Sequence, residues 1–83
     1  MGKVLTVLKV FPLEEYDLEK LRGNVEKVEG CNSSKIIDYV FGSRIIQASF
    51  VCEDSKSKDF EEIVRATVEG VSEVQVEEVG LVS

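Results

Sequence analysis

An α+β fold is predicted by three features of the 83-residue chain. Four segments are rich in β-branched and aromatic residues and alternate apolar with polar positions, as strands covered on one face do. Two other segments carry apolar residues at helical spacing, one within each half of the chain. The order β-α-β-β-α-β folds, under the right-handed crossover rule, into a four-stranded antiparallel sheet with both helices on one face, the ferredoxin-like α/β plait.

The first strand is predicted over Lys3 to Phe11, and Pro12 closes it because proline cannot continue a sheet ladder. Asp17 is a suitable N-cap for the helix that follows. The apolar positions of this helix recur at offsets of three, four and three, the spacing of one buried face: Leu18, Leu21, Val25 and Val28. Gly30 is expected to end the helix.

Two strands are predicted in the middle of the chain, at Lys35 to Val40 and at Arg44 to Glu53, with residues 41–43 as the connection. Residues 32–34, Asn-Ser-Ser, match a glycosylation sequon but are expected to form a turn. The third strand alternates clearly, which predicts one face in the core and one in water. Its core positions are Ile46, Ala48, Phe50 and Cys52, and its solvent positions are Gln47, Ser49 and Glu53.

The second helix is marked by one apolar stripe, formed by Phe60, Ile63, Val64, Thr67, Val68 and Val71. Asp59, followed three residues later by a glutamate, resembles a capping box with Asp in place of Ser or Thr. Gly70 can adopt the left-handed conformation that stops the helix. Alternation resumes over Glu73 to Val79 and predicts the fourth strand, with Val74 and Val76 pointing inward.

The chain is small and acidic, because its 10 basic and 16 acidic residues give a formal net charge of −6. A fold of this length buries roughly 60 to 65% of the unfolded surface, enough for one core, so we expect a single domain over residues 1–83. The negative charge, the absence of Trp and the few aromatic residues argue against direct binding of nucleic acid. A folded or basic protein partner is favoured.

The hydropathy pattern argues against a membrane protein. The longest apolar run, Ile45 to Cys52, has eight residues, whereas a membrane-spanning helix needs roughly 20. Lys9 interrupts the apolar stretch near the N-terminus, so no secretory signal is predicted and a cytoplasmic protein is expected.

The residues that carry most enzyme chemistry are missing from the sequence. There is no His to act as a general base, and the two cysteines, Cys31 and Cys52, lack the spacing of a redox or metal pair. Dinucleotide and phosphate-binding fingerprints do not occur, and the paired glutamates fall on predicted solvent faces. We therefore expect no catalysis, no cofactor and no metal site, and we interpret the chain as a binding module.

One segment departs from simple packing. Residues 39–41 are all large and apolar and Gly42 follows them, so apolar groups stand where the chain has to turn. Arg44 comes next and is the only charge between positions 38 and 53. An aromatic residue at a hairpin tip needs either a core to fill or a partner to meet. Two interpretations stay open: Phe41 lies under the sheet edge, or Phe41 and Arg44 contact a partner.

Eight segments along the chain carry a family resemblance: Met1-Gly2, Val7 to Pro12, Asp17-Leu18-Glu19, Val40-Phe41-Gly42, Ile45 to Ala48, Cys52-Glu53-Asp54, Val68 to Ser72 and Val74 to Val79. Together they resemble archaeal elongation factor 1-beta and, more distantly, the catalytic domain of the eukaryotic factor. The resemblance covers nearly the whole chain, and the order and spacing of the segments are more specific than any single motif.

The resemblance implies a translation factor that binds elongation factor 1-alpha, the GTPase that carries aminoacyl-tRNA, releases GDP and lets GTP enter. In the family, exchange proceeds by displacing the magnesium ion and distorting the phosphate-binding region, which removes a main electrostatic anchor of the phosphates. No covalent bond changes, in agreement with the missing catalytic groups. The residues expected to bind the partner are Phe41, Gly42 and Arg44 at the hairpin and Gly80, Leu81 and Val82 at the C-terminal end.

The C-terminal end departs from the family pattern. Eukaryotic members carry a lysine, and archaeal relatives often arginines, beside a terminal leucine, and that cation is held to intrude on the magnesium site. This chain has Gly80 and Leu81 there, followed by Val82 and Ser83. Three explanations stay open: an apolar wedge does the work, Arg44 supplies the charge from the hairpin, or exchange is weaker.

The competing interpretation is a plait without exchange activity, a small regulatory or assembly module. Such a module binds a small ligand between its helices or a protein partner through a sheet edge. Acylphosphatase-like catalysis on this fold would need a glycine-rich phosphate loop with a paired Arg and Asn, and the sequence has no such loop. Release of labelled GDP from elongation factor 1-alpha distinguishes exchange from the competing functions.

Overall fold

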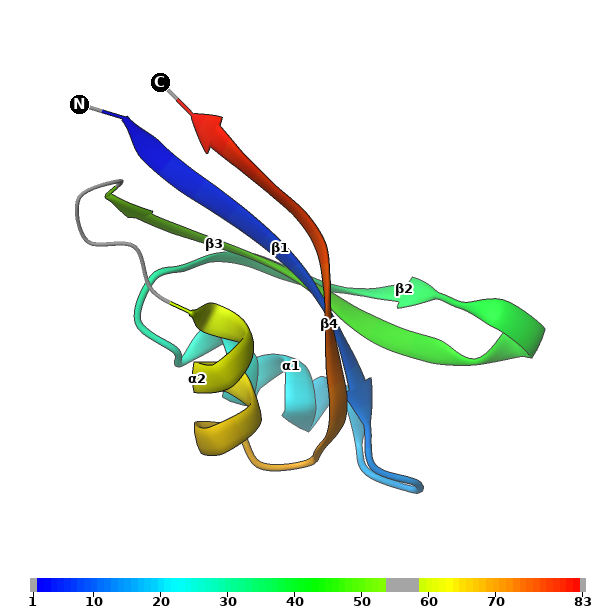
Figure 1. Cartoon of the computed structure of the whole chain (residues 1–83). Coiled ribbons are helices and arrows are strands. Elements are labelled where there is room, and N and C mark those ends of the chain that lie inside the picture. Colours follow the sequence, from blue (N-terminus) through cyan, green and yellow to red (C-terminus); the bar gives the residue numbers. More distant parts are fainter. Residues whose placement is uncertain (1, 54–58, 83) are drawn as a thin grey trace.

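The computed structural model describes residues 2–53 and 59–82 and folds them into one sheet and two helices (Figure 1). The elements are β1 (Lys3–Pro12), α1 (Leu18–Glu26), β2 (Cys31–Asp38), the 3-10 turn η1 (Val40–Gly42), β3 (Arg44–Glu53), α2 (Phe60–Thr67) and β4 (Val71–Val82). The strands pair antiparallel in the spatial order β2-β3-β1-β4, and both helices lie on the same face (Figure 1). The predicted ferredoxin-like plait is confirmed.

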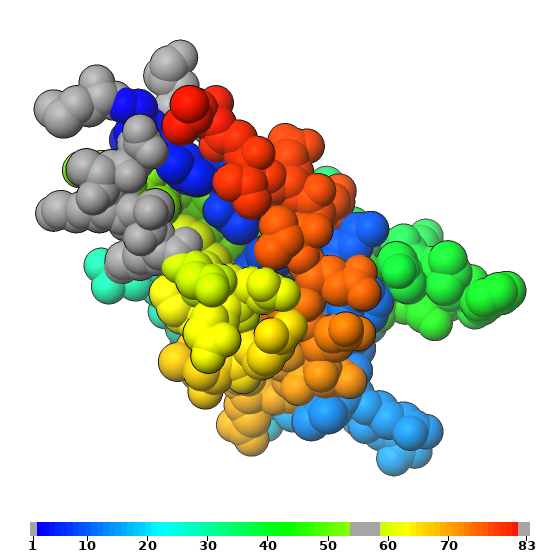
Figure 2. All heavy atoms as spheres, viewed as in Figure 1, coloured from blue at the N-terminus to red at the C-terminus, as the bar shows by residue number. Residues whose placement is uncertain are grey.

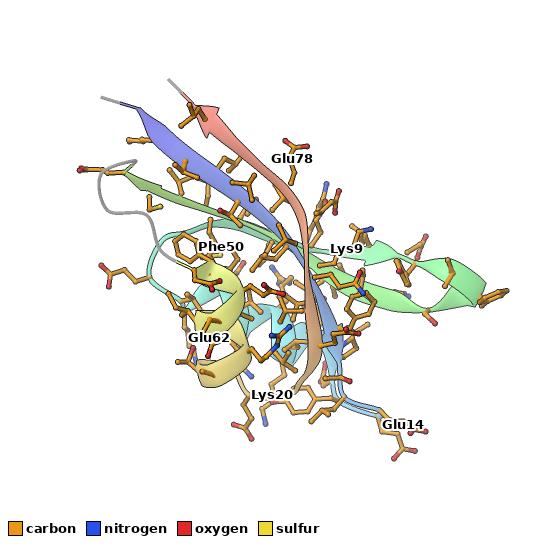
Figure 3. The ribbon with its side chains drawn as sticks, in the orientation of Figure 1. Lys9, Glu14, Lys20, Phe50, Glu62 and Glu78 are labelled. Atoms are coloured by element: carbon orange, nitrogen blue, oxygen red, sulfur yellow. The ribbon has the colours of Figure 1, made fainter. Side chains whose placement is uncertain are left out.

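The core lies between the sheet and the two helices. On β3 the predicted alternation is confirmed, because Ile46 and Phe50 are fully buried while Gln47 on the other phase is partly exposed. The Phe50 ring points toward α2 (Figure 3) and stacks on Phe60, with ring centroids 4.9 Å apart. The other buried members of this core are Leu8, Val10, Leu21, Val25, Ala48, Val64, Val68 and Val74. Each large side chain buried here stabilises the fold by roughly 1.5–3 kcal/mol.

Both helices begin at the predicted aspartates. The Asp17 carboxylate accepts hydrogen bonds from the backbone N–H groups of Glu19 (2.9 Å) and Lys20 (3.4 Å). The Asp59 carboxylate accepts one from the N–H of Glu62 at 3.2 Å. These caps satisfy amide donors that have no partner inside the helix.

The helix ends differ in part from the prediction. α1 ends at Glu26 rather than at Gly30, which lies with φ of 98° in the turn before β2. After α2, Gly70 has φ of 92°, so its left-handed conformation is confirmed. Thr67 does not belong to the buried stripe, because it is exposed and its hydroxyl donates to the Ile63 carbonyl at 2.6 Å.

β2 differs from the prediction at both ends, because it runs over Cys31–Asp38 and not over Lys35 to Val40. Residues 32–34, predicted as a turn, belong to this strand, and Ser33 Oγ lies 2.7 Å from Ser49 Oγ on β3. Pairing with β3 outweighs the turn preference of Asn and Ser. β2 is also an edge strand, where polar side chains are tolerated.

β4 is longer than predicted and contains a β-bulge. Leu8 of β1 pairs with Val76, whereas the preceding residue, Val7, pairs with Glu78. Glu77 is therefore an extra residue in β4 without a partner in the β1 register. Beyond the bulge the strand remains paired with β1 as far as Val82.

The two valines predicted to point inward from β4 differ in burial. Val74 is buried, but Val76 is 47% exposed although its partner Leu8 faces the core. Val76 therefore lies on the helix-covered face, as predicted, but it is not buried, because β4 is an edge strand and its outer side has no neighbouring strand. Val79 pairs with the buried Thr6, so it lies on the helix-covered face, yet it is 60% exposed.

The sheet is longer than the helices that cover it, and the described part of the chain measures 42 × 23 × 16 Å along its principal axes (Figure 1). At one end the hairpin of β2 and β3 projects beyond the helices. At the other end, the start of β1 and the end of β4 project in the same way. The residues predicted to bind a partner are located at these two ends.

Candidate partner interface

A tight turn connects β2 to β3 and leaves the Phe41 side chain exposed to solvent. Tyr39 N–H donates to the Ser43 carbonyl at 2.7 Å, and Ser43 N–H donates to the Val40 carbonyl at 3.1 Å. Inside this ring Phe41 (φ 55°) and Gly42 (φ 76°) are both left-handed. A bulky residue is uncommon in that conformation, whereas glycine adopts it readily.

Phe41 is fully exposed, with a relative accessibility of 102%. The interpretation that Phe41 lies under the sheet edge is therefore wrong. Because the hairpin projects from the body of the molecule (Figure 2), its exposed phenylalanine is available to another molecule. The structure does not contain that molecule, so the role of Phe41 in binding stays a prediction.

A small apolar cluster lies at the base of the hairpin, where Phe11, Tyr39 and Ile45 line the same hollow. The rings of Phe11 and Tyr39 meet edge to face, with centroids 5.2 Å apart, and the Lys9 ammonium lies 5.6 Å from the Tyr39 ring centroid. Ile45 is only 2% exposed although it belongs to the phase of β3 that faces away from the helices. The consecutive isoleucines at positions 45 and 46 are the sequence signal that both faces of β3 are covered here, a signal that the expected alternation did not include.

Arg44 lies beside this turn, at the first position of β3 and opposite Asp38 of β2. It is exposed, and in the described ranges it takes part in none of the ion pairs, which lie within the two helices. The hairpin therefore exposes both Phe41 and Arg44, and their contact with a partner stays a prediction.

The second predicted group, at residues 80–82, is not a free tail. Gly80 pairs with Leu5, and Leu81 pairs with Val4, inside the β4–β1 ladder. Leu81 is nevertheless 75% exposed, because the helices do not reach this end of the sheet (Figure 1). A Cβ added at Gly80 would meet no atom within 4 Å, so the surface beside it is open.

The two predicted groups lie at opposite ends of the sheet (Figure 1). Leu81 is opposite Val4 at the start of β1, whereas the hairpin extends past Phe11 near the end of β1. The length of strand between them, plus the hairpin, corresponds to roughly 30 Å at about 3.3 Å per residue. Arg44 therefore does not lie where a cation at position 81 would lie, and the three explanations for the missing basic residue stay predictions.

Further features of the described residues bear on the competing functions. A depression of about 310 Å³ lies between the ends of the helices and includes Asn24, whose side-chain amide donates to the Glu69 carbonyl at 3.1 Å.

Burial, and secondarily the Glu26 carboxylate, raises the pKa of the Cys31 thiol, which disfavours the reactive thiolate. Across residues 2–53 and 59–82, no group of three or more His, Cys, Asp or Glu is placed to hold a metal ion, and neither helix is long and apolar enough to cross a membrane.

Comparison with known proteins resolves the family. The EF-1 guanine nucleotide exchange domain matches residues 5–82. The chain belongs to this family. A search of curated proteins gave no match. The EF-1 exchange domain here covers both the projecting hairpin and the end of β4, so both candidate contact regions lie inside the matched domain. Membership of this family makes the chain a guanine nucleotide exchange domain that acts in translation elongation. This function involves an elongation GTPase.

Proposed function

We propose that this exchange domain releases GDP from elongation factor 1-alpha and allows GTP to enter, in the cytoplasm where translation takes place. The observation that carries the proposal is the family match over residues 5–82. An exchange factor needs no catalytic side chain, because it acts by binding the nucleotide-free GTPase more tightly than the GDP-bound form. Reciprocity then requires that it weaken GDP binding by the same factor.

The hairpin tip and the end of β4 supply the main contacts in this proposal. Phe41 is a fully exposed aromatic anchor, and Leu81 is an exposed apolar residue on a strand that β1 holds in place. Since roughly 30 Å of sheet separates them, they contact different parts of the GTPase at the same time. Two contacts on one rigid body strengthen each other, because the second forms without a further loss of translational freedom.

The direct test is release of fluorescent GDP from elongation factor 1-alpha of the same organism. With excess unlabelled GTP, release should be several times faster when the protein is added, and the rate should saturate with its concentration. A GTPase of another class, loaded with the same nucleotide, is the specificity control. An unchanged release rate over the full concentration range would contradict the proposal and favour a plait without exchange activity.

Leu81→Lys tests how the end of β4 acts on the GTPase. We expect this variant to slow GDP release by roughly threefold to tenfold, because a lysine placed in an apolar contact loses hydration without an assured partner. If a cation is what displaces magnesium, the same substitution should accelerate release instead, through repulsion of the metal ion. Stopped-flow release of fluorescent GDP measures either outcome.

Two further chains make the test at Leu81 specific. Val76→Lys adds the same charge to an exposed valine nearer the middle of β4 and should leave the release rate close to that of the unaltered protein. A chain that ends at Val79 lacks the contact altogether. With this chain, GDP release from the GTPase should be as slow as it is with Leu81→Lys. Full activity in the shortened chain would remove any role for the end of β4.

A further inference from the structure

A notch separates the loop between β1 and α1 from the hairpin tip. In Figure 2 the loop (blue) and the hairpin (green) project as two prongs with a hollow between them. The hollow has a volume of about 480 Å³, within the roughly 300–1,000 Å³ typical of pockets that enclose a ligand group. Its apolar lining includes Phe11, Leu13, Tyr16, Tyr39, Val40 and Ile45.

The loop wall of the notch is held in place by the turn before β4. Leu13 N–H donates to the Gly70 carbonyl at 2.8 Å, and Tyr16 N–H donates to the Leu13 carbonyl at 3.0 Å. The Tyr16 ring lies directly over Gly70, and its hydroxyl accepts a hydrogen bond from the Asn24 amide at 3.2 Å. The opposite wall is the hairpin, where the Tyr39 ring packs against Phe11 of β1. Because both walls are already ordered, an incoming side chain loses little affinity to ordering of the notch.

The charges around the notch indicate the chemistry of its occupant. Glu14 and Glu15 are exposed on the loop, with Glu14 at its outer edge (Figure 3), and Arg44 is exposed on the hairpin. Leu13 (48% exposed) and Val40 (55% exposed) present apolar surface between them. The complementary group is an apolar side chain that enters the notch, with a basic side chain beside it that faces the two glutamates.

We propose that the notch receives such a side chain from elongation factor 1-alpha, as a binding site separate from Phe41 itself. This inference rests on the proposed exchange function and adds the chemistry of one contact to it. The notch adjoins the Phe41 tip, so one segment of the GTPase reaches both. A second copy of the chain is a poorer occupant, because it carries the same net charge of −6 and would repel the acidic loop.

Ser43→Phe tests the proposal by filling the notch without removing an existing contact. Ser43 lines the notch, is exposed, and has an extended backbone (φ −71°, ψ 156°) that phenylalanine adopts without strain. Isothermal titration into nucleotide-free elongation factor 1-alpha should show affinity about tenfold weaker, with the melting temperature of the free protein unchanged. Ser72→Phe, on an exposed serine of β4 outside the notch, should bind as the unaltered protein does.

The acidic rim is tested by replacing both glutamates, Glu14→Gln with Glu15→Gln. We expect the affinity to fall several-fold at low salt, and the difference from the unaltered protein to shrink at high salt, because exposed charges are screened. Unaltered affinity at low salt would show that no basic side chain of the GTPase faces the two glutamates.

The outcomes separate this inference from the function on which it rests. If the unaltered protein binds the GTPase and accelerates GDP release, and Ser43→Phe does both equally well, the notch proposal is wrong and exchange stands. An equal loss of binding in Ser72→Phe would also overturn it. Concentration-dependent dimerisation of the free chain that Ser43→Phe abolishes would assign the notch to a second copy. If the unaltered protein does neither, both proposals fall together.

Discussion

Phe41→Ala should weaken binding to nucleotide-free elongation factor 1-alpha about thirtyfold, which corresponds to about 2 kcal/mol. The free energy of unfolding should change little, because the ring is fully exposed and contributes nothing to the core. Alanine is the appropriate replacement at φ 55°, since it keeps the Cβ and its backbone strain, whereas glycine would also relax the turn. Titration calorimetry and urea unfolding measure the two quantities on the same preparation.

Val76→Ala is a suitable control for Phe41→Ala, because it shortens an exposed apolar side chain on β4, outside both projecting ends. Its binding should equal that of the unaltered protein. A loss of stability in Phe41→Ala as large as the loss of binding would identify Phe41 as a packing residue. Unchanged binding would remove the hairpin tip from the interface.

Gly70→Ala should destabilise the fold by about 2–4 kcal/mol, through two effects that act together. At φ of 92° an alanine is strained whatever the space around it. Its Cβ would also lie closer than 3.0 Å to atoms of the Tyr16 ring, which must then move off the turn. For a domain of this size the melting temperature should fall by roughly 10–25 °C, which thermal unfolding followed by circular dichroism measures.

Gly23→Ala is the matched control, because Gly23 lies within α1 and a Cβ there meets nothing within 4 Å. That substitution should stabilise the protein by about 0.5–1 kcal/mol, since alanine favours a helix interior more than glycine does. If Gly70→Ala unfolds at the same temperature as the unaltered chain, the turn before β4 does not have the described geometry.

The fold was predictable because its signals are local and periodic. The bounds of β3 and its two phases from Ile46 onward follow from the alternation of apolar and polar residues, and the caps at Asp17 and Asp59 follow from short-range hydrogen bonding. The start of β2 was not predictable in this way, because residues 32–34 favour a turn until β3 pairs with them. The exposure of Val76 likewise depends on the position of β4 at the sheet edge.

The candidate site was less accessible to sequence reasoning than the fold. An apolar residue followed by glycine marks position 41 as a turn, but only the left-handed φ decides that its ring faces solvent. The separation of Phe41 from Leu81 follows from strand register, which a list of residues does not contain. The notch combines two loops that are remote in sequence, so no spacing pattern predicts it.

The bulge at Glu77 has a consequence for how relatives of this chain are compared. Side chains alternate along a strand, so the extra residue decides that Val79 and Leu81, rather than Glu78 and Gly80, share the helix-covered face with Val74. Deletion of one residue at the bulge would move the side chains at the end of β4 to the opposite face of the sheet and leave every other strand unchanged. In an alignment, a gap shifted by one column at this point would therefore equate residues from opposite faces. The number of residues in β4 therefore matters for its C-terminal end as much as their identity does.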